Sequence, residues 1–248
     1  VDLRGSCQGA GLREALLAPL SYGPFPVRCY LSSASGIGFP ALSNPQSQKM
    51  NPSEIGSANV VVIGGGIVGC SIAYHLTQLG ISDVVLLERK KLTSGTTWHA
   101  AGLVAQLRAS QNMTRLSSYS TELFAELAQQ TGQETGYQQT GSMTLALNPE
   151  RLEELKRQAT MANAFGVKCE VVDESFVQAQ WPGIQTHNLC GGVYLPGDGQ
   201  TNPVDTTLAL AKGARSNGAQ IFEDTKVARL AIENGQAVGV CLDDGTLI

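Results

Sequence analysis

A run of glycines between a short apolar stretch and a helical one constrains this chain more than any other feature. Residues 59–63 predict a short, fully buried strand, the sequence Gly64-Gly65-Gly66-Ile67-Val68-Gly69 follows at once, and residues 70–79 predict a helix. We expect Gly64 to permit the tight turn, Gly66 to let the backbone approach a pyrophosphate, and Gly69 to let the helix pack close to the strand.

An acidic residue completes this pattern. Residues 83–87 predict a second strand, and Glu88 follows its end, about 20 residues beyond the glycines. A carboxylate there accepts hydrogen bonds from both ribose hydroxyls and disfavours NADP, because it repels the 2′-phosphate. Amides at the helix N-terminus favour the phosphates. The sequence therefore predicts a dinucleotide site, with a glycine-rich structural turn as the alternative, and the motif alone does not separate NAD from FAD.

Charge and cysteine spacing exclude several other classes. A net charge of −4 over 248 residues argues against a nucleic-acid binder, because it provides no basic field to neutralise phosphates. No apolar run is long enough to predict a membrane span. The cysteines form no C-x-x-C pair, which argues against a metal site or disulfide framework and fits a reducing compartment. We expect Cys70, in the first helix, to be a small buried residue.

The two ends of the chain differ from its middle. Residues 1–57 form a leader, and its first 50 residues are rich in Gly, Ser, Pro and Ala and contain more arginine than acid. This composition predicts an organellar transit peptide, with untranslated sequence before a start at Met50 as the alternative. Either way we expect disorder there. At the other end, residues 242–248 predict a turn and an unfinished strand, so we expect the N-terminal part of a longer protein.

Residues 58–248 predict an α/β fold with an insertion. Strands near residues 60, 85 and 220 predict a parallel sheet, interrupted at about 105–200 by mixed helices and strands. Such an interrupted nucleotide domain suits a flavoprotein better than a plain NAD dehydrogenase. The remaining predicted elements are a helix over 113–130 with Leu116, Leu123, Phe124 and Leu127 on one face, helices that begin at Asn148-Pro149 and Asn202-Pro203, and a hairpin over 227–232 and 236–242.

A tryptophan–histidine stretch makes the chain recognisable. From about Ala58 onward it resembles the sarcosine dehydrogenase and dimethylglycine dehydrogenase family of FAD-dependent, DAO-type amine oxidoreductases. The most specific segment is Leu92-Thr93-Ser94-Gly95-Thr96-Thr97-Trp98-His99-Ala100-Ala101-Gly102-Leu103, and residues 58–63, 85–89 and 194–199 are also similar. The resemblance implies a Rossmann-like FAD-binding domain of the glutathione-reductase type, with the insertion as a substrate domain.

The resemblance also implies roles for single residues. The family histidine that matches His99 is bonded covalently to the 8α carbon of the flavin, and a turn-capping histidine is the alternative. Glu88 would hold the ribose, and the main chain of Val227 would face the adenine. Arg89, Thr96 and Thr97 would lie near the phosphates or the ribityl chain.

The other aromatic and histidine side chains have simpler interpretations. Trp98 is either a contact for the flavin edge or a core aromatic residue. His75 is expected to pack within the first helix, and His187 to be solvated in a polar loop. We name no catalytic acid or base.

The implied reaction is oxidative N-demethylation of sarcosine or dimethylglycine. A hydride equivalent leaves the N-methyl group for flavin N5, and the one-carbon unit passes to tetrahydrofolate or is released as formaldehyde. Tetrahydrofolate binding would need a C-terminal domain that this chain lacks. Full-length relatives also continue through the rest of the FAD and substrate domains, so the walls of the substrate pocket would be mostly absent and we expect the chain alone to be inactive. Mitochondrial members of the family pass electrons to electron-transfer flavoprotein. We therefore expect a mitochondrial matrix location, or a cytoplasmic one if Met50 is the start.

Two other functions remain open. One is a regulatory, non-catalytic relative like the regulatory subunit of pyruvate dehydrogenase phosphatase, which resembles the same flavoprotein family. The other is a glycine or D-amino-acid oxidase that uses oxygen. The Trp98-His99 pair favours the amine dehydrogenase over both.

Overall fold

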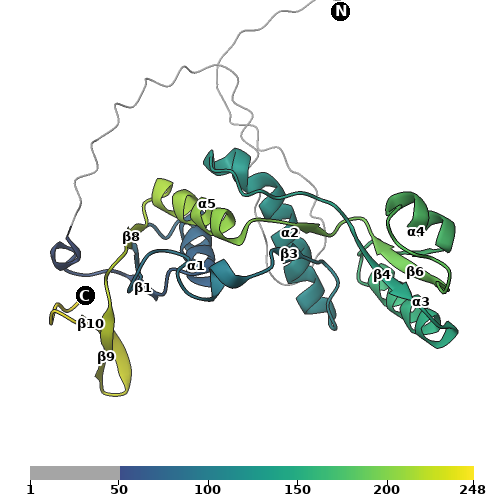
Figure 1. The fold of residues 1–248 in the computed structure, drawn as a ribbon. Helices are drawn as coiled ribbons and strands as arrows, with labels where there is room; N and C mark the ends of the chain where they lie inside the picture. Colours follow the sequence, from purple (N-terminus) through teal and green to yellow (C-terminus); the bar gives the residue numbers. More distant parts are fainter. Residues whose placement is uncertain (1–50) are drawn as a thin grey trace, which may run out of the picture. The chain divides into compact units, whose positions relative to one another are not determined.

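The computed structural model describes residues 51–248, so the predicted leader lies outside the described residues apart from its last seven positions. The elements appear in Figure 1. The first half of the described chain contains η1 (Pro52–Glu54), β1 (Val60–Ile63), α1 (Ile67–Gln78), β2 (Val84–Leu87), η2 (Thr96–His99), β3 (Leu103–Val104), α2 (Gln111–Thr131) and β4 (Ser142–Ala146). The second half contains α3 (Pro149–Ala164), β5 (Glu170–Val172), α4 (Glu174–Gln180), β6 (Gly191–Leu195), β7 (Gly199–Gln200), α5 (Pro203–Ser216), β8 (Gln220–Phe222), β9 (Val227–Glu233) and β10 (Gln236–Leu242).

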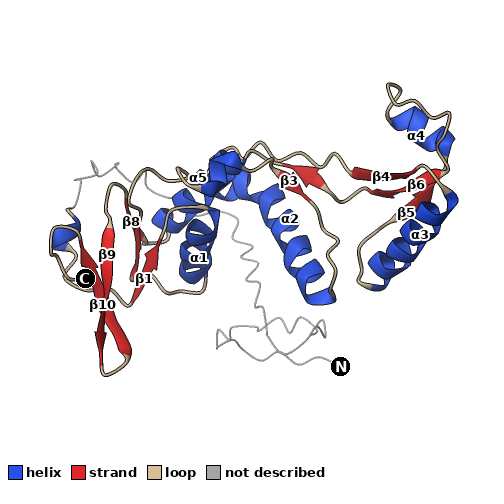
Figure 2. Ribbon diagram, turned by 60° about the horizontal axis from the view of Figure 1, so that its bottom comes forward, coloured by secondary structure: helices blue, strands red, loops and turns tan. Residues whose placement is uncertain are grey.

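A parallel sheet of order β1-β2-β8 carries the glycine motif, as the sequence predicts. The central strand, β2, is buried on both faces because its side chains alternate between two cores. Val84 and Leu86 face the helices, whereas Val85 and Leu87 pack with the hairpin of β9 and β10. Figure 2 shows α1 and α5 beside this sheet.

The prediction that residues 59–63 form a fully buried strand is wrong. Only Val62 of β1 is buried, and the side chain of Ile63 is 53% exposed. β1 is more exposed because it is an edge strand of the described sheet, whereas β2 has a partner strand on each side. A continuous apolar run does not distinguish these two places.

The first core, called here the helical core, is formed by the contact of α1 with α5 beneath one face of the sheet. Tyr74 of α1 lies against Gly213 of α5, and its hydroxyl donates to Oε1 of Gln130 on α2 at 2.7 Å. The buried members of the helical core are Val62, Cys70, Ala73, Tyr74, Val84, Leu86, Leu92, Leu127, Ala209, Leu210, Ala211, Ala214 and Ala219.

Helix α2 follows the predicted boundaries, but its buried face differs from the predicted one. Leu127 is buried in the helical core, whereas Leu116 is 58% exposed. Thr114 and Thr121 take the buried positions instead. Each threonine hydroxyl bonds a nearby backbone carbonyl, at Arg108 and Ser117 respectively, so the side chain can be buried like an aliphatic one.

A second core lies within residues 146–195, in the sequence range predicted as an insertion. The antiparallel sheet β4-β6-β5 packs on α3 there, and Asn148 begins α3 by accepting from the Arg151 amide at 2.8 Å. The short strands β3 and β7 pair antiparallel where the chain enters and leaves this range. The buried carboxylate of Asp198 accepts from the amide of Gln106 and the hydroxyl of Ser142, at 2.8 and 2.5 Å.

The contact of α1 with α5 yields the first testable prediction. Alanine for glycine inside a helix normally gains about 1 kcal/mol. A Cβ at Gly213, however, would lie 2.7 Å from a Tyr74 ring carbon, and overpacking costs about 1–3 kcal/mol. We therefore expect Gly213→Ala to lower the unfolding midpoint. Ser216→Ala, an exposed change on the same helix, is the control. An equal rise of the unfolding midpoint in both variants would contradict the overpacking of Gly213→Ala against Tyr74.

Candidate functional site

The predicted glycine motif forms the turn between β1 and α1. Gly64 has a φ of +112°, which favours glycine, and its amide donates to the Leu87 carbonyl at 2.9 Å. Helix α1 begins at Ile67 with Gly66 as its N-cap. A Cβ at Gly69 would collide with the Gly64 carbonyl oxygen, so Gly69 is required for the close packing that the sequence predicts.

Sequence reasoning missed one glycine of this turn. A Cβ at Gly65 would lie 2.5 Å from a methyl group of Leu92 and 2.9 Å from the Cβ of Glu88. Gly65 is therefore also restricted to glycine, by the loop that follows β2. The spacing motif treats this position as variable, and the only sequence signal is the unbroken run of three glycines.

Glu88 lies at the end of β2, as predicted, and its carboxylate contacts the glycine turn. Oε2 accepts from the Gly65 amide at 2.7 Å, and Oε1 accepts from the Lys90 amide at 2.9 Å. A carboxylate offers about four acceptor positions, so two remain for other donors. Glu88 thus fixes the turn and can still accept from a ligand.

The loop after β2 is held on two sides. The Thr93 amide donates to the Gly65 carbonyl at 3.0 Å, and the Leu92 amide donates to the Glu223 carboxylate at 2.7 Å. Thr93 is buried with a φ of +68°, an unusual conformation for a β-branched residue. This strained position was not predicted, because a threonine in the sequence gives no sign of it.

Helix η2 follows that loop and carries Trp98 and His99. Thr97 is buried, and its Oγ1 accepts from the Ile67 amide of α1 at 3.0 Å. Trp98 is 60% exposed and therefore is not a core aromatic residue. Its ring centroid lies 4.2 Å from that of the exposed His99, so the two rings form a solvent-facing pair.

The structure brings most of the predicted site residues together. Gly64, Gly66 and Gly69 form the turn, which Glu88 and Thr97 contact directly. The Arg89 side chain is exposed on the loop after β2, and Thr96, the first residue of η2, is also exposed. Val227 begins β9, two residues after Thr225, whose amide donates to the Glu88 carbonyl at 2.8 Å.

The remaining histidines have structural surroundings. His75 connects α1 to α2, because its Nε2 lies 2.8 Å from the Tyr119 hydroxyl and its Nδ1 lies 2.6 Å from the Ser71 carbonyl. His187 is exposed, as expected. Among residues 51–248 no cluster of His, Cys, Asp or Glu is suited to hold a metal ion.

The glycine turn fits the diphosphate of a dinucleotide. Within residues 51–248 the amides of Gly66, Val68 and Gly69 donate to no protein acceptor, and they lie at the N-cap and in the first turn of α1. Such amides and the helix dipole favour an anion. The missing Cβ at Gly66 opens the surface beside them, and the two spare acceptor positions of Glu88 suit ribose hydroxyls.

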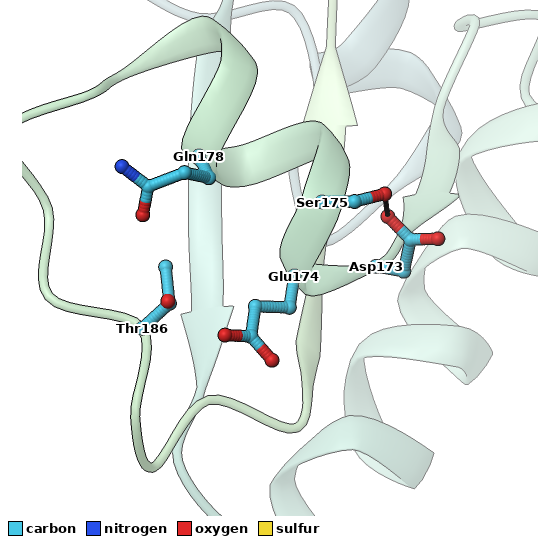
Figure 3. A pocket seen from close by; sticks show the side chains of 5 residues that line it. All are labelled: Asp173, Glu174, Ser175, Gln178 and Thr186. Atoms are coloured by element: carbon cyan, nitrogen blue, oxygen red, sulfur yellow. Dashed lines mark hydrogen bonds between the residues drawn. The ribbon is translucent and has the colours of Figure 1, made fainter.

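An open hollow elsewhere has different chemistry. Figure 3 shows its lining by Asp173, Glu174, Ser175, Gln178 and Thr186 around α4. The Ser175 hydroxyl donates to the Asp173 carboxylate at 2.7 Å, which helps to hold the pKa of Asp173 below its usual value. This hollow contains none of the predicted site residues.

In the part of the chain that the model describes, no helix is long and apolar enough to span a membrane.

The comparisons with known proteins agree on a family. The family model described as FAD dependent oxidoreductase matches residues 59–247. The solved L-proline dehydrogenase from P. horikoshii superposes with a TM-score of 0.72 at 29% identity, over 76% of this chain and 50% of that one. This likeness confirms a mixed α/β fold of the kind found in FAD-dependent oxidoreductases.

Curated relatives are similar over the same region. Human sarcosine dehydrogenase is 42% identical over 177 residues, which cover 71% of this chain and 19% of that protein. Rat dimethylglycine dehydrogenase is 42% identical over 173 residues, or 70% and 20% of the two chains. The mouse pyruvate dehydrogenase phosphatase regulatory subunit is 40% identical over 190 residues, or 77% and 22%. The chain thus spans about a fifth of these relatives, all of which are described as mitochondrial.

The contacts of Glu88 yield a prediction. Glu88→Ala removes the acceptor of the buried Gly65 amide, and an unsatisfied buried donor costs about 1–3 kcal/mol. We expect a lower unfolding midpoint for Glu88→Ala than for Glu88→Gln, which keeps one acceptor oxygen. The exposed change Glu134→Ala serves as the control. Equal midpoints for the two Glu88 variants would show that the bond to Gly65 contributes nothing.

The buried thiol of Cys70 yields a further prediction. Burial raises the pKa of this thiol from 9.0 to about 12, with a smaller opposing effect of Arg215, and Sγ faces the Gly65 carbonyl at 3.7 Å. In iodoacetamide labelling at pH 8 followed by peptide mapping, we expect the exposed Cys190 to react while Cys70 stays unmodified until the protein unfolds. Early labelling of Cys70 would contradict its buried position.

The raised pKa of Cys70 also affects stability. Between about pH 9 and about pH 12 the unfolded chain loses the Cys70 proton while the folded chain keeps it, so this group lowers stability as pH rises.

Proposed function

The chain belongs to the FAD dependent oxidoreductase family, and from that premise we propose that it holds the FAD of an amine oxidoreductase that acts on N-methylated glycine. The observation that carries the proposal is the juxtaposition of the glycine turn, Glu88 and the Thr97–His99 segment, which hydrogen bonds join directly. The relatives named for sarcosine and dimethylglycine support the substrate class.

The proposed FAD contacts follow from the free groups of the site. The amides of Gly66, Val68 and Gly69 bind the pyrophosphate, and the spare acceptor positions of Glu88 bind the ribose. Arg89 is exposed on the loop after β2 and Thr96 at the start of η2, where they can reach the phosphates or the ribityl chain. The main chain at Val227 faces the adenine.

We propose that His99 tethers the flavin. Its exposed ring is presented on η2, where an imidazole nitrogen would bond to the 8α carbon of the flavin. Attachment would remove one proton from the imidazole and one from the 8α methyl group, and the two electrons would leave with the electron acceptor that serves turnover. Trp98, whose ring lies beside that of His99, would contact the flavin edge.

The proposed reaction is oxidative N-demethylation. Bound FAD supplies the acceptor for a hydride equivalent from the N-methyl carbon. The chain contributes orientation and electrostatics, and it offers no residue that we assign as a catalytic acid or base. The one-carbon unit passes to tetrahydrofolate, held by a domain outside this chain, or leaves as formaldehyde. Electron-transfer flavoprotein in the mitochondrial matrix is the proposed acceptor, in keeping with the mitochondrial relatives.

A regulatory role is the second candidate. It is favoured by the 40% identity to the regulatory subunit of pyruvate dehydrogenase phosphatase over 77% of the chain. Turnover separates the two, because a purely regulatory protein does not oxidise sarcosine or dimethylglycine with an artificial electron acceptor. Peroxide formed in proportion to substrate, without another acceptor, would indicate an oxidase instead.

The tether yields a direct prediction. After acid precipitation of the full-length protein, we expect flavin absorbance to stay in the pellet, and His99→Ala to release it into the supernatant. The matched control is His187→Ala, which changes an exposed histidine outside the site and leaves the flavin in the pellet. Release of flavin from the unmodified protein would refute the tether while leaving reversible FAD binding possible.

A further inference from the structure

We propose that Thr97 is a positioning residue that fixes the histidine-bearing helix η2 to the N-terminus of α1, and so sets where His99 meets the flavin. This inference rests on the proposed function and deepens it, because it assigns the efficiency of the covalent tether to a residue that acts through the protein. It gives Thr97 a role that differs from the direct ligand contact that the sequence suggests.

The hydrogen bond of Thr97 acts as a helix cap supplied from elsewhere in the chain. The N-cap of α1 is Gly66, which has no side chain to accept from the first turn. Thr97, 30 residues further along, supplies the missing acceptor through Oγ1, 3.0 Å from the Ile67 amide. The bond therefore joins the two segments that the cofactor must contact together.

The fit between the two segments is tight. A Cβ built on Gly66 would lie 3.1 Å from Thr97 Oγ1, closer than most real Cβ contacts. Gly66 thus serves two purposes, since its missing side chain opens the surface to a diphosphate and also lets η2 approach. Of the four residues of η2, Thr97 alone is buried, while Thr96, Trp98 and His99 face solvent.

A second contact fixes the segment that runs from Thr97 to Gly102 at its C-terminal end. The Thr201 amide donates to the Gly102 carbonyl at 2.8 Å, and a Cβ at Gly102, whose φ is +77°, would collide with the Thr201 carbonyl. Thr201 itself is bonded to the Thr135 carbonyl at 2.9 Å. His99 therefore lies between a fixed point two residues before it and another three residues after it.

This two-point attachment has a chemical consequence. Bond formation to the flavin depends on the approach of one ring nitrogen, and a misplacement of about 1 Å can slow such a step by about a hundredfold. Loss of the Thr97 acceptor frees one end of the segment while the glycine turn and Glu88 remain. Reversible FAD binding should then survive when covalent attachment does not.

The experiment compares Thr97→Val, Thr97→Ser and Thr97→Ala in the full-length protein. Total flavin is measured by absorbance of the folded protein, and covalent flavin by what remains in the pellet after acid precipitation. We expect Thr97→Val to bind FAD with a covalent fraction reduced about tenfold or more, and Thr97→Ser to restore the fraction because it keeps the acceptor. Hydrogen–deuterium exchange of the peptide that spans Ile67 should quicken in Thr97→Val and Thr97→Ala, which lack the acceptor, but not in Thr97→Ser. Thr97→Ala, which leaves room for water, replaces Thr97→Val if the latter does not fold.

The controls separate this inference from the proposed function. Ser94→Ala removes an exposed hydroxyl from the same loop and should keep the covalent fraction of the unmodified protein. A normal covalent fraction in folded Thr97→Val or Thr97→Ala, or failure of Thr97→Ser to restore it, overturns the positioning role alone. Absence of acid-stable flavin in the unmodified protein, with FAD bound, overturns the tether and the positioning role together.

Discussion

The hydrogen bond between the Glu88 carboxylate and the Gly65 amide is the contact from which the candidate site is built. It joins the end of β2 to the turn after β1, two places that parallel strands bring to the same edge of a sheet. The bond also fixes the loop after β2, because Gly65 accepts from Thr93. That loop leads into η2, so the position of His99 depends on the geometry of the glycine turn.

Burial of β2 supports this arrangement from both sides. Its alternating side chains enter the helical core and the core shared with the hairpin, and this burial holds the end of β2, which Glu88 follows. The Glu88 amide donates to the Phe222 carbonyl at 2.9 Å, so the third strand helps to fix the same edge. The range from β3 to β7 has its own core, and the Gly102–Thr201 contact lies where the chain enters and leaves it.

Family membership extends over residues 59–247 and includes relatives named as dehydrogenases and one named as a regulatory subunit. The fold is therefore shared by proteins of different roles, and the functional proposal rests on single residues instead. These residues are Glu88, which bonds the glycine turn, Thr97, which bonds the N-terminus of α1, and His99, which η2 presents to solvent.

The sequence alone predicts the local elements, because strand runs, glycine turns and Asn-Pro helix starts depend on neighbouring residues. It identified the glycine turn, Glu88 at the end of a strand, and the buried position of Cys70. Tertiary structure is needed to see that Ile63 is exposed, that Gly65 admits no side chain, and that buried threonines replace Leu116 on α2. It also decided that Thr97 caps a helix 30 residues earlier in the chain. These features depend on contacts between segments distant in sequence, which the order of neighbouring residues does not record.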